Sequence, residues 1–364
     1  MNHHQRIDLT IALIDYPGPD FLKQAAIQAI QDGHNEYSRE RGNLQLRQAV
    51  ADKMRSFYDF ALDPKSEIII THGATEGIFG SVMGLVQPGD EVILIEPCYE
   101  WYRPIVKMAG GIPKIFTLQA PTWTLDAESL GALFTERTRM IILNNPHNPT
   151  GHIFSDEERA LIATLCEKYD VVAVSDEVYE HLTYDGRRHE PLAVYPGMRE
   201  RTITVSNITK TFGMTGWKLG WTIAGPEITR LIWEVHRLAL GSCNAPIQEA
   251  AITAVQAPKS LYEQYAEDYQ RKRDILMQAL HKADLNPTLP QGGSFIISDI
   301  SRLGFNDEAI FCKRLLDKTG IAAKQAGVQY LQDNHPTTLV RWAFCKREQT
   351  LMEVASRLEN ADLS

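Results

Sequence analysis

Short, almost wholly apolar runs recur along the first two thirds of the chain. They are SEIII (66–70), DEVILIEP (90–97), RMIIL (139–143), DVVAVSDE (170–177), TITVSN (202–207) and WTIAG (221–225). A run without polar alternation is typical of a strand that is buried on both faces, as in a parallel or mixed sheet covered by helices. The pattern therefore predicts an α/β unit around a central sheet.

The segments between these runs have helical patterns, and the chain changes character after them. Ser155 and Glu158 have the spacing of a capping box at the start of a helix. A long amphipathic helix is predicted over 262–283, followed by the alternating strands GGSFIISDIS and TTLVRWAFCK of an α+β unit. We predict a large domain over 38–258 and a smaller domain built from both chain ends, 1–37 and 259–364.

Composition narrows the classes of protein. The formal net charge of −9 over 364 residues argues against nucleic-acid binding, which needs a basic face. No run of 18 apolar residues predicts a membrane span, and the start, MNHHQRIDLT, does not have the layout of a signal peptide. Five scattered cysteines without a CxxC motif indicate reduced thiols and a cytoplasmic protein, and we expect no metal site.

Polar clusters follow the predicted strands, where ligands gather in open α/β sheets. They are THGATEG (71–77), CYEWY (98–102), NNPHNPTG (144–151), DEVYE (176–180) and the lysine-containing stretch from 206 to 221. Free amides of Ala74 and Thr75 at a helix N-terminus suit a phosphate, although an ordinary strand–helix turn has the same pattern. We interpret Phe79, Trp101 and Tyr102 as core or pocket wall.

Lys210 raises the sharpest question, because it lies just beyond a core strand in SNITKTFGMTGWKLGW. Burial of a charged amine there is costly. Either Lys210 extends to solvent or pairs with an acid, or it is uncharged because it is bound to a carbonyl. Asp176, predicted at the end of another buried strand, needs a cationic partner for the same reason.

The motifs GATEG, NPHNPTG, SDEVYEHL, KTFGMTGWKLGW and LVRWAFCK occur in the order and spacing of a known family. The chain resembles the class I/II aminotransferases, pyridoxal-phosphate enzymes of fold type I, most closely their methionine and kynurenine aminotransferase branch. The resemblance implies a large domain with a mixed, mostly parallel sheet between helices, plus a smaller α+β domain. No GxGxxG follows a strand, so a nicotinamide-dinucleotide enzyme is the weaker alternative.

The resemblance also implies roles for residues around the cofactor ring. Lys210 would bind the cofactor aldehyde as a Schiff base and, once displaced, move the Cα proton. Asp176 would pair with the pyridine nitrogen. Asn148 and Tyr179 would hydrogen-bond the 3-oxygen of the ring, and Tyr99 would stack on its face.

Further roles concern the phosphate, the substrate and a second subunit. Ala74, Thr75 and Lys218 would hold the phosphate, with Asn207 where the family commonly has a phosphate-binding serine. Arg341 would grip the substrate α-carboxylate as a bidentate fork, with Asn144 and Asn148 in the same pocket. Tyr37 matches a tyrosine that reaches the partner subunit's phosphate, which implies a homodimer with shared active sites.

The chain departs from the family near its start. In place of the usual glycines it has LTIALID (9–15), so side chains such as that of Ala12 would reshape the substrate pocket. The expected activity is transfer of an amino group from an L-amino acid to a 2-oxo acid. The alternatives are a β- or γ-eliminase or a cyclase of specialised amino-acid metabolism with the same Lys210–Asp176 core, and a non-catalytic domain of this fold.

Overall fold

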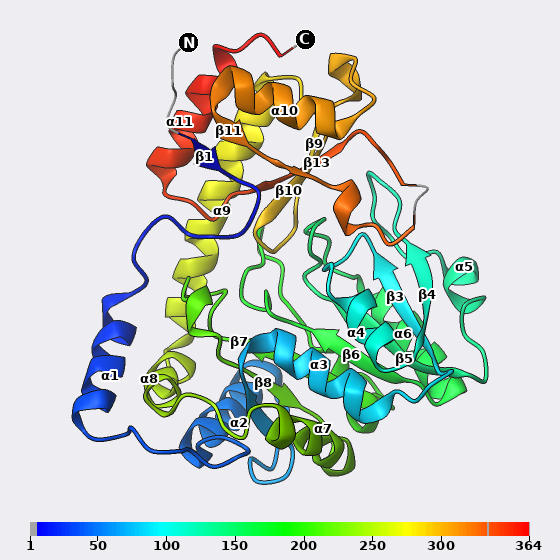
Figure 1. The fold of residues 1–364 in the computed structure, drawn as a ribbon, viewed down its shortest axis with the longest axis vertical. Helices are drawn as coiled ribbons and strands as arrows, with labels where there is room; N and C mark the ends of the chain where they lie inside the picture. Colours follow the sequence, from blue (N-terminus) through cyan, green and yellow to red (C-terminus); the bar gives the residue numbers. More distant parts are fainter. Residues whose placement is uncertain (1–5, 333–334, 364) are drawn as a thin grey trace.

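The computed structural model describes residues 6–332 and 335–363 and is organised around a seven-stranded sheet (Figure 1). Its strands are β2 (Ile68–Thr71), β3 (Glu91–Glu96), β4 (Ile112–Thr117), β5 (Thr138–Asn144), β6 (Val172–Asp176), β7 (Thr202–Asn207) and β8 (Gly220–Ile223). The order is β2-β8-β7-β6-β5-β3-β4. Only β8 is antiparallel to its neighbours, β2 and β7, so the predicted mixed, mostly parallel sheet is confirmed.

All six apolar runs form strands of this sheet, but the sequence pattern did not reveal β4. This strand lies at the edge, and its residues are mostly half-buried instead of buried. It contains Pro113 and Lys114, which an edge strand tolerates because one side of it needs no hydrogen-bonded partner. The strand therefore lacks the continuous apolar run that marks a central position.

Helices cover both faces of the sheet. Their bounds are α2 (Leu44–Tyr58), α3 (Gly73–Leu85), α4 (Tyr102–Met108), α5 (Ala127–Gly131), α6 (Asp156–Tyr169), α7 (Pro226–Ala239) and α8 (Ala245–Val255). Alternate residues of β2 point to opposite faces: Ile68 and Ile70 pack with α2 and α8, and Ile69 packs with α3, α4 and α7. The predicted capping box starts α6, where Ser155 and Glu158 exchange hydrogen bonds.

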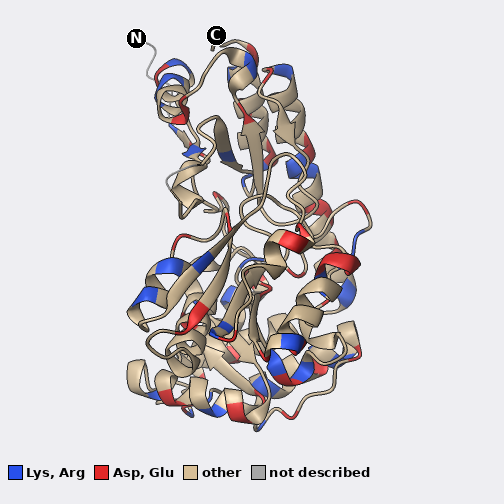
Figure 2. Ribbon diagram, turned by 90° about the vertical axis from the view of Figure 1, so that its right-hand side faces the viewer, with Lys and Arg blue, Asp and Glu red and all other residues tan. Residues whose placement is uncertain are grey.

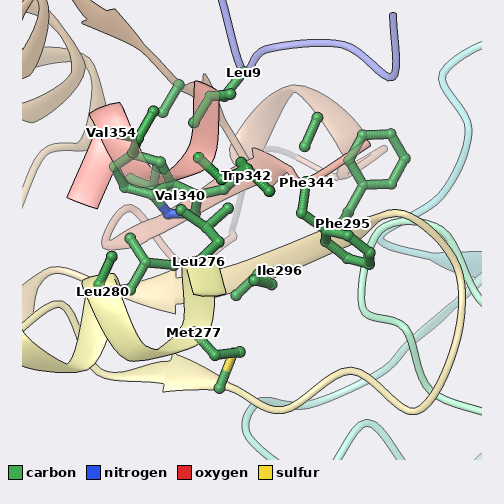
Figure 3. Packing of buried hydrophobic residues seen from close by; sticks show 14 of the residues in the cluster. Leu9, Leu276, Met277, Leu280, Phe295, Ile296, Val340, Trp342, Phe344 and Val354 are labelled. Atoms are coloured by element: carbon green, nitrogen blue, oxygen red, sulfur yellow. The ribbon is translucent and has the colours of Figure 1, made fainter. Parts of the chain in front are cut away.

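The second unit is smaller and has an antiparallel sheet of β9 (Pro287–Thr288), β10 (Phe295–Asp299), β12 (Lys324–Gln325) and β13 (Leu339–Ala343). It also contains α9 (Lys259–Lys282), α10 (Glu308–Thr319) and α11 (Glu348–Glu359). Figure 3 shows Val340 and Trp342 of β13 gathered with Leu276 of α9, Val354 of α11 and Leu9 in one buried cluster. Burial of this apolar face joins both chain ends into one unit.

The start of the chain contacts both units. β1 (Ile7–Asp8) runs parallel to β11 (Ile321–Ala322) of the small unit. In contrast, α1 (Asp20–Gln31) packs against α8 of the large unit (Figure 1). The boundaries at residues 37 and 258 stay predictions.

Figure 2 shows acidic and basic residues interspersed along the helices of both units, in keeping with a modest net charge of −9. Among the described residues, no helix combines the length and the apolar character needed to cross a membrane.

Candidate active site

A cavity of about 150 Å³ lies where the central strands end. The predicted residues that line it are Ala74, Thr75, Tyr99, Asn144, Asn148, Asp176, Tyr179, Asn207, Lys210 and Lys218. The chain therefore brings together residues that span 145 positions of the sequence, numbers 74 to 218. Arg341, Ala12 and Tyr37 lie outside this lining.

The sheet register explains how the polar groups meet. Asn144 at the end of β5 lies opposite Asp176 at the end of β6, and β7 ends beside them at Asn207. Oδ1 of Asn207 accepts hydrogen bonds from the Lys210 amide at 2.9 Å and from the Thr209 hydroxyl at 3.0 Å. The side chain of Asn207 thus shapes the turn that holds Lys210.

Asp176 is a buried carboxylate with one strong donor. The hydroxyl of Tyr102 donates to its Oδ2 at 2.5 Å, and the Val178 amide lies 3.4 Å from Oδ1. Burial raises the pKa of Asp176 from 3.8 to about 6, although the hydrogen bond from Tyr102 opposes the shift. The site therefore fits a ligand that brings a positive charge to Asp176. Tyr102, which we had interpreted as core or pocket wall, is the partner that the sequence did not reveal.

The amine of Lys210 lies against Tyr179. Nζ is 5.6 Å from the centre of the Tyr179 ring, whose hydroxyl accepts a hydrogen bond from Ser294 Oγ at 3.4 Å. Burial lowers the pKa of Lys210, but Tyr179 and then Cys345 act in the opposite direction, and together such groups leave the pKa raised. Tyr179 and Cys345 thus offset the cost of placing this amine in the cavity.

The opposite end of the cavity fits a phosphate. The first turn of α3 has no side-chain cap, so the amides of Ala74 and Thr75 are available to an anion. A Cβ atom on Gly220 would lie 2.6 Å from the Ser206 carbonyl oxygen and 3.0 Å from the Ala74 nitrogen. Only glycine allows β8 to approach α3 this closely, and the approach brings Lys218 to the same end.

Arg341 of β13 is a buried cation without an acidic partner among the described residues. Nη1 donates to Asn148 Oδ1 at 3.3 Å, and Nη2 donates to the Thr10 carbonyl at 2.7 Å. Its guanidinium lies 4.0 Å from the centre of the Phe295 ring, and its buried Nε has no hydrogen-bond partner. Burial lowers the pKa of Arg341 to about 10. An unpaired buried charge is costly, so the geometry fits an anionic ligand.

The altered N-terminal segment lies close to Lys210. Ala12 and Ile14 line a small second cavity together with Tyr179 and Lys210. The segment is held at several points: the Leu13 carbonyl accepts a hydrogen bond from Lys346, and Asp15 Oδ1 accepts one from the Arg347 amide at 2.7 Å. Side chains of this segment thus lie beside Lys210, as the sequence predicted for Ala12.

Tyr37 does not reach the cavity of its own chain. Its side chain is 97% exposed and lines a separate, open hollow with Leu240 and Asn244.

Comparisons with known proteins identify the family. The profile of aminotransferase class I and II matches residues 5–358. The chain is 36% identical to methionine aminotransferase of Escherichia coli over 98% of this chain and 92% of the relative. It is 35% identical to kynurenine–oxoglutarate transaminase of Dictyostelium discoideum, over 98% of this chain and 90% of the relative.

Solved structures agree. An N-succinyldiaminopimelate aminotransferase from Mycobacterium tuberculosis superposes with a TM-score of 0.94 at 37% identity, covering 97% of this chain and 93% of that chain. A methionine aminotransferase from Escherichia coli superposes with a TM-score of 0.95 at 35% sequence identity. The match covers 98% of this chain and 94% of that chain. The chain belongs to the class I and II aminotransferases. It is a pyridoxal-phosphate-dependent aminotransferase of fold type I, which confirms the prediction from the motifs.

Proposed function

We propose that Lys210, Asp176 and Tyr179 carry out the chemistry, and that the enzyme moves the amino group of an L-amino acid to a 2-oxo acid. The observation that carries this proposal is that Lys210 and the buried Asp176 line one cavity. The names of the relatives, methionine, kynurenine and N-succinyldiaminopimelate aminotransferases, support an amino-acid donor.

Pyridoxal phosphate, when bound, supplies an aldehyde that condenses with amines and a ring that takes up the electrons released at the substrate Cα. Lys210 would hold it covalently, and the Asp176 carboxylate would keep the ring nitrogen protonated. Asn148 and Tyr179 would donate to the ring oxygen, and Tyr99 would cover the ring face. Thr75 and Ala74 amides, together with Lys218 and Asn207, would hold the phosphate.

Lys210 also provides the base. With its amine free beside Tyr179, Lys210 would take the proton from the substrate Cα. The Tyr179 side chain, with its ring centre 5.6 Å from Nζ, can steer that amine. Arg341 fixes the substrate α-carboxylate and so sets which Cα bond faces the ring, with Asn144 and Asn148 beside it. Ala12 would contact the substrate side chain.

Dependence on an acceptor tests this function. We expect one good amino-acid donor to convert the cofactor absorbance once and then stop, because the amino group has nowhere to go until a 2-oxo acid is added. Addition of the oxo acid should start steady turnover, followed as new amino acid. Continued formation of product from the donor alone would instead indicate elimination or cyclisation.

Arg341→Ala should raise the KM for the amino-acid donor by about tenfold or more, because a charge-assisted, two-pronged contact to the carboxylate is lost. Turnover should fall by a smaller factor, since the carboxylate also orients the Cα bond. Arg341→Lys is the matched control, because it keeps the charge but loses the two-pronged contact. Its KM should lie between those of the wild type and Arg341→Ala. An unchanged KM in Arg341→Ala would place the carboxylate elsewhere.

A homodimer is part of the proposal, with Tyr37 of each chain completing the phosphate site of the other. Its support is the 97% exposure of Tyr37 beside Leu240, an apolar side chain that is itself 46% exposed. We also propose a cytoplasmic location, in keeping with five free cysteines.

Mixing two variants tests the shared site. Lys210→Ala lacks the amine, and Tyr37→Ala should bind the cofactor weakly, so each alone should be nearly inactive at limiting cofactor. After random exchange, half of the dimers are mixed and each has one intact site, which restores about a quarter of the wild-type activity. A mixture that is no more active than the sum of its parts would mean that each site belongs to one chain.

A further inference from the structure

Glu100 and Lys324 form an ion pair between the two units, next to the active site. Nζ of Lys324 in β12 donates to Oε2 of Glu100, in the loop between β3 and α4, at 2.8 Å. Glu100 directly follows Tyr99, which lines the cavity. Lys324 is the register partner of Arg341 in the neighbouring strand. The pair thus adjoins both the cavity and the arginine that would hold the substrate carboxylate.

The register places two cations side by side. Residues directly opposite in an antiparallel pair project from the same face, with Cβ atoms about 4.5–5.5 Å apart, and like charges there repel. Glu100 supplies the counter-charge for Lys324, whereas Arg341 has no acidic partner among the described residues. The Glu100 carboxylate also acts on Arg341, since it opposes the lowering of the Arg341 pKa by burial, after a larger effect of Tyr179.

The pair is partly exposed to solvent and does not lie in the core. The side chain of Lys324 is 21% exposed and that of Glu100 is 42% exposed, so a ligand can reach both charges. A substrate fixed by its amine near Lys210 and by its α-carboxylate at Arg341 has its side chain as the remaining substituent. Within β12 and β13 the charged residue other than Arg341 is Lys324, which pairs with Glu100.

We propose that the Glu100–Lys324 pair determines the charge that the substrate side chain can carry. While the two charges cancel, the surface beside Arg341 is neutral and suits donors with uncharged side chains. Lys324 without its partner would hold a second carboxylate beside Arg341, and Glu100 without its partner would repel one. This inference rests on the proposed role of Arg341 as the carboxylate anchor.

Binding of two matched acids to the cofactor-loaded enzyme tests the proposal without any turnover. Valerate and glutarate both have five carbons, with one and two carboxylates, and their dissociation constants can be measured by calorimetry. Relative to valerate, glutarate should bind about fivefold to tenfold more tightly to Glu100→Gln than to the wild type. Lys324→Met should weaken the binding of glutarate relative to that of valerate. The double variant should return the ratio of the two dissociation constants to its wild-type value.

Glu234→Gln is the charge-matched control, because Glu234 pairs with Arg230 on the surface of α7 and does not line the cavity. It should leave the glutarate-to-valerate ratio unchanged. Ratios within twofold of the wild type in both Glu100→Gln and Lys324→Met would overturn the proposal. If Arg341 does not hold the substrate carboxylate, the result is different. Valerate would then bind equally well to the wild type and to Arg341→Ala.

Discussion

We expect Lys210→Ala to lose at least about a thousandfold in turnover, the largest effect of any single change in this enzyme. The substitution removes the covalent attachment point and also the base that moves the Cα proton, and general base catalysis alone contributes about 10²–10⁴-fold. Steady-state amino transfer from one donor to one 2-oxo acid measures the loss.

Borohydride identifies the attached lysine directly. Reduction of the cofactor-loaded wild type should fix the cofactor on Lys210, as a peptide of increased mass, and the same treatment of Lys210→Ala should fix none. Lys218→Ala is the matched control, since it removes a lysine at the phosphate end of the same cavity and should keep the label on Lys210. A label on Lys218 or on another lysine would contradict the assignment.

The central sheet could be predicted because its strands are buried on both faces and so leave continuous apolar runs. Each run from SEIII to WTIAG corresponds to a strand within a few residues. The edge strand β4 could not be predicted in this way, because most of its residues are only half-buried and Pro113 and Lys114 interrupt the apolar run. Which units α1 and β1 contact depends on tertiary packing, which local patterns do not encode.

The candidate site was predictable where motif residues lie at strand ends, as Asp176 and Lys210 do. Contacts made across the sheet were not. Tyr102 and Asp176 are 74 positions apart, and no spacing rule joins a helix residue to that carboxylate. The same holds for the ion pair of Glu100 with Lys324, which depends on how the small unit sits over the large one.

Asp176→Asn should keep the fold but lower turnover by about 10²–10³-fold, because a neutral amide cannot keep the ring nitrogen protonated as electrons arrive. The two side chains are nearly the same size, so Oδ1 of the asparagine can still accept the hydrogen bond from Tyr102. The KM for the donor should change little, since Arg341 still holds the carboxylate. Turnover within a few-fold of the wild type would show that the charge of Asp176 is not needed.

The same substitution should stabilise the cofactor-free protein above pH 6. Burial raises the pKa of Asp176 from 3.8 to about 6, so the folded state binds this proton more tightly than the unfolded state does. Below pH 3.8 the carboxyl is protonated in both states and causes no difference. As the pH rises from 3.8 to about 6, the unfolded state loses its proton first, and the wild type loses up to about 3 kcal/mol of unfolding free energy. The asparagine side chain of the variant does not titrate and escapes this loss.

Urea unfolding of both cofactor-free proteins measures the effect. The variant and the wild type should be of similar stability near pH 4, and the variant should be the more stable one at pH 8. Asp52→Asn, at an exposed position of α2, should show no such divergence. The opposite result would be a wild type whose unfolding free energy rises relative to that of Asp176→Asn as the pH increases. It would mean that a neighbouring cation such as Lys210 stabilises the carboxylate by more than burial disfavours it. The predicted order, greater stability with far lower turnover, would show that Asp176 is retained for its charge toward the cofactor and not for the fold.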